Sequence, residues 1–131
     1  MKKECFFTTN SPIFRVLREM YAENRLTVII CYVTGCRISR VLRVQRSDLS
    51  GDYITIDHVR YRLPPQVAAA LKRIAPRAGY IFPHRDVPDR HRTRQAVYKD
   101  LLRAQRDIGV NEGFTPLGVS KMLLSSKQMP L

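Results

Sequence analysis

The N-terminal third of the chain carries apolar residues at helical spacing. Asn10-Ser11-Pro12 offers a capping side chain followed by a proline near the first helical position. Phe14, Leu17 and Tyr21 then recur every three or four residues. This pattern predicts a helix that runs to about Glu23.

The next segment, Leu26–Val33, is apolar at almost every position. Its β-branched residues favour a strand, but a short run that is apolar all round also suits a buried helix, and periodicity does not decide between them. After a turn at Thr34-Gly35, the aliphatic residues Ile38, Val41 and Leu42 predict a second amphipathic helix, which extends to about Arg46.

The middle of the chain alternates with a period of two. Asp52–Ile56 and Val59–Leu63 each predict a half-buried strand, and the intervening Asp57-His58 predicts a tight hairpin with basic residues on one face. Pro64-Pro65 ends the hairpin. A short third strand is expected at Tyr80–Phe82.

Two further helices follow from periodicity and from stop signals. The first has Val67, Ala70, Leu71 and Ile74 on its core side and stops before Pro76. The second runs from about Thr93 to Ile108 and ends at Gly109, with Val97, Leu101 and Ala104 facing inward. The predicted fold class is α+β: a mainly helical single domain of residues 1–131 with a small antiparallel hairpin or three-stranded sheet.

Composition and charge narrow the class of partner. With 131 residues, 44% hydrophobic and 26% charged, the chain is that of one folded soluble domain. A net charge of +12 attracts polyanions, because binding releases counterions from a phosphate backbone. Of the 23 basic residues 17 are Arg, whose guanidinium fork matches phosphate and guanine edges. Double-stranded DNA is the expected partner.

Other classes of function lack support in the sequence. Cys5, Cys31 and Cys36 are an odd set without metal-site spacing and are expected to be reduced packing thiols. His84 and His91 lack a third ligand, so neither a metal nor another cofactor is predicted. No apolar run approaches the roughly 20 residues that span a bilayer, and we expect a cytoplasmic protein without membrane contact.

One motif carries a family resemblance. Thr34-Gly35-Cys36-Arg37-Ile38-Ser39, followed by Val41-Leu42 and Ser47-Asp48-Leu49, resembles the first arginine motif of the tyrosine recombinases, the phage integrase family. The order of the later elements is similar to that of the integrase catalytic domain over residues 12–116. The resemblance implies that 26–33 is helical and that Arg37 grips a DNA phosphate.

The same resemblance shows where the chain departs from a recombinase. Thr115-Pro116 matches the family's approach to its His-x-x-Arg box, but Leu117 and Ser120 stand where the His and the second Arg are expected. The family's nucleophilic Tyr follows that box, and the last tyrosine here is Tyr98. Because Leu cannot transfer a proton and Ser cannot neutralise a phosphorane, the resemblance implies a catalytically inactive pseudo-recombinase, not an enzyme.

The candidate DNA contacts are all arginines. Arg37, Arg40, Arg43 and Arg46 recur every three residues, and like charges so close on a helix call for an anionic partner. Arg40 replaces the family's usual Glu, and Arg60 or Arg62 replaces its hairpin Lys. The predicted DNA-binding set is Arg37, Arg40, Arg43, Arg60, Arg62, Arg90, Arg92, Arg94 and Arg103.

Simpler interpretations stay open for these residues. The series can be a solvated arginine face with Arg37 in an internal salt bridge, and alternating charge on a hairpin is also ordinary solubility design. Asp86, Asp89 and Asp100 are expected to balance nearby arginines.

The sequence therefore predicts an inactive, integrase-like DNA-binding protein of a bacterial plasmid or mobile element, which regulates or assists transcription, transfer or recombination. One alternative is a recombinase subunit completed in trans by a partner chain, and the candidate protein partners are a second copy or a recombinase or regulator chain. Another is a helix-turn-helix regulator centred on Thr34-Gly35. A third is an interaction module or integrase remnant without a DNA role.

Overall fold

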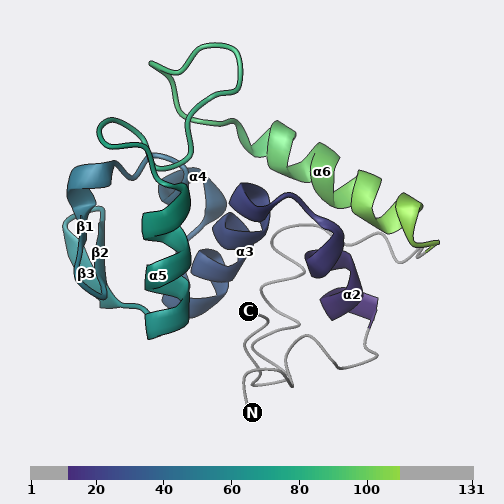
Figure 1. Cartoon of the computed structure of the whole chain (residues 1–131), viewed down its shortest axis with the longest axis horizontal. Helices are drawn as coiled ribbons and strands as arrows, with labels where there is room; N and C mark the ends of the chain where they lie inside the picture. Colours follow the sequence, from purple (N-terminus) through teal and green to yellow (C-terminus); the bar gives the residue numbers. More distant parts are fainter. Residues whose placement is uncertain (1–11, 110–131) are drawn as a thin grey trace.

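The computed structural model describes residues 12–109, with side chains described from Arg15 onward. Figure 1 shows the arrangement of these residues. The elements in chain order are α2 Pro12–Glu19, α3 Ala22–Thr34, α4 Ile38–Val41, the 3-10 helix η1 Arg46–Asp48, β1 Leu49–Ser50, β2 Tyr53–Ile56, β3 Val59–Arg62, α5 Pro65–Ile74 and α6 Arg94–Asp107. The predicted α+β class is confirmed. The Thr115-Pro116 region and the predicted tail 117–131 lie outside the described residues.

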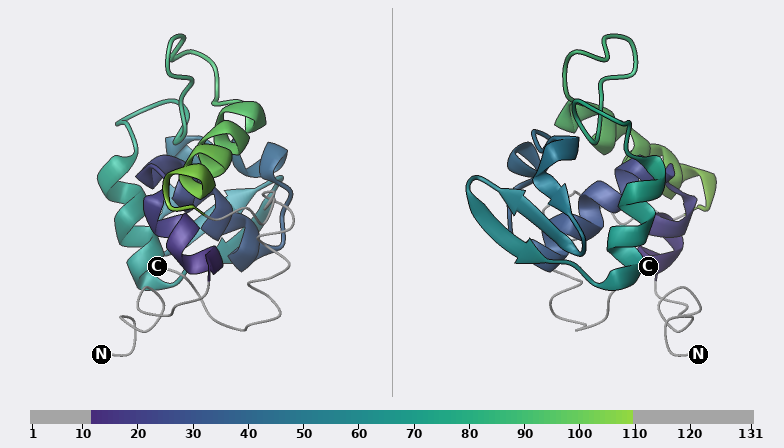
Figure 2. Two further views of the ribbon diagram at one scale, coloured as in Figure 1. Left: turned by 90° about the vertical axis from the view of Figure 1, so that its right-hand side faces the viewer. Right: turned by 60° about the vertical axis from the view of Figure 1, so that its left-hand side comes forward.

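Helix α3 occupies the centre of the fold. The ambiguous run Leu26–Val33 is helical, as the family resemblance implied, and residues 26–31 are buried. Gly35 ends the helix with a left-handed backbone (φ +75°), and its N–H donates to the Cys31 carbonyl at 2.9 Å. In Figures 1 and 2 the sheet and α6 lie on opposite sides of α3, so the two regions are separated by the core.

The sheet is small and antiparallel, with strand order β1-β2-β3. The predicted hairpin is confirmed, with Tyr53 opposite Arg62 and Thr55 opposite Arg60. Asp57 and His58 form its two-residue turn, both with positive φ (52° and 67°), as a turn matched to the strand twist requires. Ile54 and Ile56 point into the core and are at most 1% exposed.

The predicted first helix is too long. It ends at Glu19, and Tyr21 is the extended N-cap residue of α3 (φ −60°, ψ 146°). The physical reason is a long-range bond, because the Tyr21 N–H donates to Asp100 Oδ2 of α6 at 2.9 Å. Tyr21 fits the helical spacing of the sequence, but tertiary contact takes its backbone out of the helix.

The predicted helix over 38–46 is also wrong beyond its first turn. Helix α4 ends at Val41, and Val41, Leu42 and Val44 are all buried. Backbone pairing with a later segment explains the change: Arg46 N–H donates to the Gly79 carbonyl at 2.7 Å, and Ile81 N–H donates to the Val44 carbonyl at 3.2 Å. The four arginines of the series therefore do not share a helix.

The strand expected at Tyr80–Phe82 does not form. Tyr80 makes only an isolated bridge with Gln45, and Pro83 makes another with His91. Ile81 and Phe82 are nonetheless fully buried, which accounts for the apolar signal in the sequence. The third strand of the sheet is instead the two-residue β1.

The last two predicted helices are confirmed as α5 and α6. Thr93 caps α6, its hydroxyl accepting from the Ala96 N–H at 3.2 Å, and Val97, Leu101 and Ala104 are fully buried. Helix α6 packs on α2, so the C-terminal part of the described chain closes the core beside its N-terminal part. Among residues 12–109 no helix is long and apolar enough to cross a membrane.

Candidate nucleic-acid interface

The turn after α3 places Arg37 on the surface. Gly35 reverses the chain, and Arg37 then adopts an extended conformation (φ −72°, ψ 151°) at the N-cap of the one-turn α4. Its carbonyl accepts from the N–H groups of Arg40 and Val41 at 3.0 and 3.2 Å, which fixes the backbone. The side chain is exposed and makes no ion pair within the described residues, so the internal salt bridge weighed from the sequence does not form there.

The same turn is joined to the hairpin by two side-chain contacts. Cys36 Sγ donates to Tyr61 Oη at 3.4 Å, and Arg40 forms an exposed ion pair with Asp57 in the hairpin turn. Its contact with Cys36 raises the pKa of the Tyr61 phenol above the ordinary value. These contacts tie α4 to β3 and identify Asp57 as an anionic partner that offsets part of the arginine series.

The outward face of the hairpin is basic. Tyr61 packs against the core, so its neighbours Arg60 and Arg62 project from the opposite face of β3. The guanidinium of Arg60 lies over the Tyr53 ring at 4.0 Å. The outward-facing Thr55, opposite Arg60, shares a shallow pocket of about 220 Å³ with Arg40 and Arg43. Arg40 and Arg43 thus lie beside the outward face of the hairpin, from which Arg60 and Arg62 project.

We name this region the α4–hairpin surface and define it by Arg37, Arg40, Arg43, Arg60 and Arg62. Within the described residues only Arg40 among these five has a carboxylate at ion-pair distance. The other four are exposed without such a partner. Exposed guanidinium groups without carboxylate partners are available to an external anion.

Two further arginines of the predicted set, Arg90 and Arg94, are exposed at the loop before α6 and at its first turn. The remaining two are held by the protein itself. Arg92 Nη1 donates to Asn24 Oδ1 at 2.8 Å, and Arg103 Nε donates to Asp100 Oδ1 at 3.0 Å. The structure therefore does not bring the nine predicted residues together in one site.

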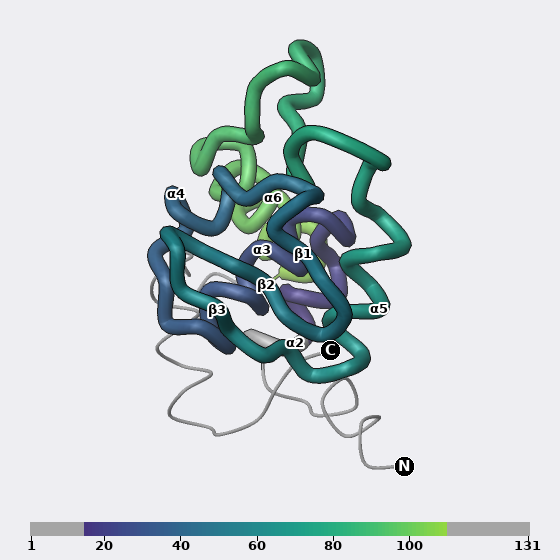
Figure 3. Tube along the Cα trace, turned by 90° about the vertical axis from the view of Figure 1, so that its left-hand side faces the viewer, coloured from purple at the N-terminus to yellow at the C-terminus, as the bar shows by residue number. Residues whose placement is uncertain are grey.

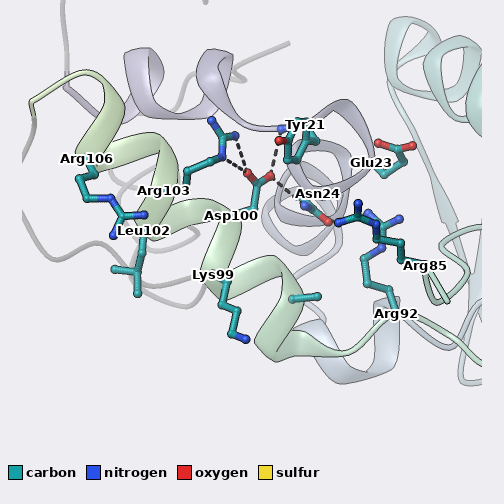
Figure 4. A pocket seen from close by; sticks show the side chains of 11 residues that line it. Tyr21, Glu23, Asn24, Arg85, Arg92, Lys99, Asp100, Leu102, Arg103 and Arg106 are labelled. Atoms are coloured by element: carbon teal, nitrogen blue, oxygen red, sulfur yellow. Dashed lines mark hydrogen bonds and ion pairs between the residues drawn. The ribbon is translucent and has the colours of Figure 1, made fainter.

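Asp100 is the centre of a polar network that sequence reasoning found only in part (Figure 4). Its carboxylate is nearly buried and accepts from the Tyr21 N–H, from Asn24 Nδ2 at 2.8 Å and from Arg103. Arg103 also donates to Asp107 Oδ2 at 2.8 Å and to the Glu19 carbonyl at 3.0 Å. The network connects α6 to both helices at the α2–α3 junction.

The prediction that Asp100 balances an arginine is confirmed, whereas Asp86 and Asp89 form no ion pair in the described part of the chain. The roles of Asn24 and Tyr21 were missed. A polar Asn beside an apolar helical run is the one signal that could have indicated a buried amide.

The cysteines of the described segment are free thiols. Cys31 is buried, and this burial raises its pKa to about 12, so it stays protonated as the predicted packing thiol. Cys36 is partly exposed beside Arg37. No group of His, Cys, Asp or Glu within residues 12–109 could hold a metal ion.

Comparison with known proteins adds one distant relationship. The chain is 26% identical over 117 residues to the "Integrase" of Escherichia phage P2, a match that covers 86% of the chain and 35% of that relative. The chain thus spans about a third of its relative's length. No protein-family model matches the chain, and no solved structure matches it. The similarity supports an integrase-like relationship.

Removing the Asp100 carboxylate should destabilise the fold strongly. Asp100→Ala leaves Arg103, Asn24 and the Tyr21 N–H without their buried acceptor, and we expect a loss of about 3 kcal/mol in the free energy of unfolding. Chemical denaturation followed by circular dichroism measures this change. The matched control, Asp107→Asn, removes the exposed partner of the same arginine and should cost less than about 1 kcal/mol. Equal effects of the two substitutions would contradict a central role for Asp100.

Proposed function

We propose that the chain binds double-stranded DNA through the α4–hairpin surface and does not by itself break the strands. The observation that carries the first part is that four arginines of the segments joined by the Arg40–Asp57 contact are exposed without carboxylate partners among the described residues: Arg37, Arg43, Arg60 and Arg62. In a protein of net charge +12, a phosphate backbone is the partner that such a surface fits best.

The geometry favours a duplex over a small anion. The arginines come from two elements that the Cys36–Tyr61 and Arg40–Asp57 contacts hold side by side, so they spread over a surface instead of converging on one point. Arg60 and Arg62 are two residues apart on one strand face, about 7 Å. A two-stranded ribbon of this kind fits the major groove of B-DNA, and arginines also contact phosphates along its edges.

The absence of strand breakage is proposed from residue chemistry. Within these 131 residues, Leu117 and Ser120 stand at the positions that the resemblance assigns to a proton-transferring His and a charge-stabilising Arg. A nucleophile and the groups that activate it act as a unit, so the loss of several removes the covalent step. The relationship to a phage integrase supports a recombinase-like protein. The accessory or regulatory role in a bacterial mobile element or plasmid is part of the proposal and follows from the missing chemistry.

The helix-turn-helix alternative has lost its main support. It required a recognition helix after Thr34-Gly35, and α4 has only four residues. The alternative of a subunit completed in trans keeps a specific observation in its favour, because Arg37 is exposed at the motif position where the family grips phosphate. A covalent test separates this alternative from the proposal.

Neutralising the α4–hairpin surface should weaken duplex binding. The variant Arg37→Ala, Arg60→Gln, Arg62→Gln loses up to three phosphate contacts, which makes the log–log slope of affinity against salt shallower by about 0.9 per contact. Fluorescence anisotropy with a labelled duplex over a salt series measures the slope. The control variant Lys72→Gln, Arg73→Gln removes two exposed charges on α5. Its log–log slope of affinity against salt should stay close to that of the wild type.

Removing a negative charge from the same surface should have the opposite effect on duplex affinity. Asp57→Asn removes the carboxylate that occupies Arg40, so the variant should bind the duplex more tightly than the wild type. Unchanged slopes for the triple variant, together with no gain for Asp57→Asn, would place the duplex elsewhere on the protein.

The chain alone should form no covalent adduct with DNA. A nicked duplex that traps tyrosyl-DNA intermediates, incubated with the protein and resolved under denaturing conditions, should yield only free protein and free DNA. An adduct formed by the chain alone would refute the proposed inactivity. An adduct that appears only after addition of a recombinase chain would establish completion in trans.

A further inference from the structure

A second basic region lies at the other end of the molecule. An open groove of about 800 Å³ runs between α6, the α2–α3 junction and the loop before α6. In Figure 3 the sheet and α4 face the viewer and α6 lies behind them, so the groove is separated from the α4–hairpin surface by the core. The groove is thus a separate surface with its own charge and shape.

The free charge of this groove is positive. Two acids, Glu23 and Asp100, line it, but the Asp100 carboxylate is already occupied by Arg103, by Asn24 and by the Tyr21 N–H. Four more basic side chains, Arg85, Arg92, Lys99 and Arg106, therefore face Glu23 alone. They are distributed along the groove: Figure 4 shows Arg106 at one end, Arg85 and Arg92 at the other, and Lys99 between them.

One of these basic groups is held in place. Arg92 donates to Asn24 Oδ1 at 2.8 Å, and Asn24 in turn donates to the buried Asp100 at 2.8 Å. A guanidinium fixed in this way loses little side-chain entropy when it binds an anion, which favours a directed phosphate contact. The buried network thus prepares the groove for a ligand as well as joining the helices.

The groove also exposes apolar surface among its charges. The Tyr21 side chain is 61% exposed although its ring lies 4.5 Å from the Arg103 guanidinium, and Leu102 is 44% exposed. A positive channel with an exposed aromatic ring suits a strand whose bases are free to stack. A duplex presents its phosphates but keeps the faces of its bases covered, so it could not place a base on the exposed part of the Tyr21 ring.

We propose that this groove binds single-stranded nucleic acid, with the backbone along Arg85, Arg92, Lys99 and Arg106 and a base stacked on Tyr21. This site goes beyond the proposed duplex binding and does not depend on it. Both DNA and RNA single strands carry the required phosphates and bases, so the chemistry is shared and experiment must identify the natural source.

The stacking contact is tested with the full chain and labelled 12-nucleotide oligo-dT and oligo-U in anisotropy titrations. Tyr21→Leu removes the ring but keeps the backbone N–H bond to Asp100, and it should weaken single-strand affinity by at least about fivefold. Tyr21→Phe keeps a stacking ring and should bind as the wild type does. Tyr98→Leu is the matched control, because Tyr98 is 40% exposed on α6 but does not line the groove.

Removing positive charges from the groove tests the phosphate contacts. The double variant Lys99→Gln, Arg106→Gln should bind single strands more weakly and with a smaller salt dependence than the wild type. The control double variant Lys72→Gln, Arg73→Gln on α5 should have a much smaller effect. Circular dichroism confirms that each variant is folded. If the groove substitutions lower the affinity for oligo-dT more than for oligo-U, the natural ligand is DNA. The opposite result identifies RNA.

The outcomes separate this site from the duplex site. Groove variants should impair single-strand binding and spare duplex binding, and the Arg37, Arg60, Arg62 variant should do the reverse. The proposal is overturned if Tyr21→Leu and the paired charge variant bind single strands as the wild type does. It is equally overturned if the groove variants weaken duplex and single-strand binding alike, because the groove would then be a duplex surface.

Discussion

The buried helix α3 is the constraint on which the rest of the structure depends. Residues 26–31 are buried, so the other elements must surround this helix and its middle cannot carry the charge of a strongly basic chain. The arginines of the two basic surfaces therefore lie on elements at either end. Gly35 then decides where the first group emerges, because its left-handed backbone ends α3 and turns Arg37 outward.

The two ends use their arginines differently. At the sheet end, arginines from α4 and the hairpin are exposed, and one carboxylate, Asp57, partners Arg40 alone. At the α6 end, a nearly buried carboxylate takes Arg103 into a network that also fixes Arg92 through Asn24. The first arrangement leaves charge free for an external backbone, and the second combines helix packing with an ordered groove.

Local patterns predicted most of the fold. The alternation of apolar and polar residues, together with the Asp57-His58 turn, was sufficient to predict the β2–β3 hairpin. Apolar periodicity with capping and stop residues was sufficient to predict α5 and α6. The family resemblance, and not periodicity, decided that 26–33 is helical. The structure places Arg40 and Arg43 beside Thr55 of the hairpin, and the contact of the predicted arginines with DNA stays a prediction.

The errors have one physical origin, which is contact between residues far apart in the chain. Tyr21 leaves the first helix because Asp100, 79 positions away, accepts its N–H. The helix over 38–46 stops after one turn because Val44 and Arg46 pair with the backbone at Gly79 and Ile81. The Asn24–Asp100 bond, and with it the inward orientation of Arg92 and Arg103, has no local signature.

The most direct test of the central claim uses Cys36 as a reporter beside Arg37. Alkylation of this partly exposed thiol, followed by mass spectrometry with and without saturating duplex DNA, shows whether DNA covers the turn after α3. Buried Cys31, whose pKa is raised to about 12, serves as the unreactive internal reference. The account predicts that duplex DNA slows alkylation of Cys36 several-fold. An unchanged alkylation rate at saturating duplex would contradict binding through the α4–hairpin surface.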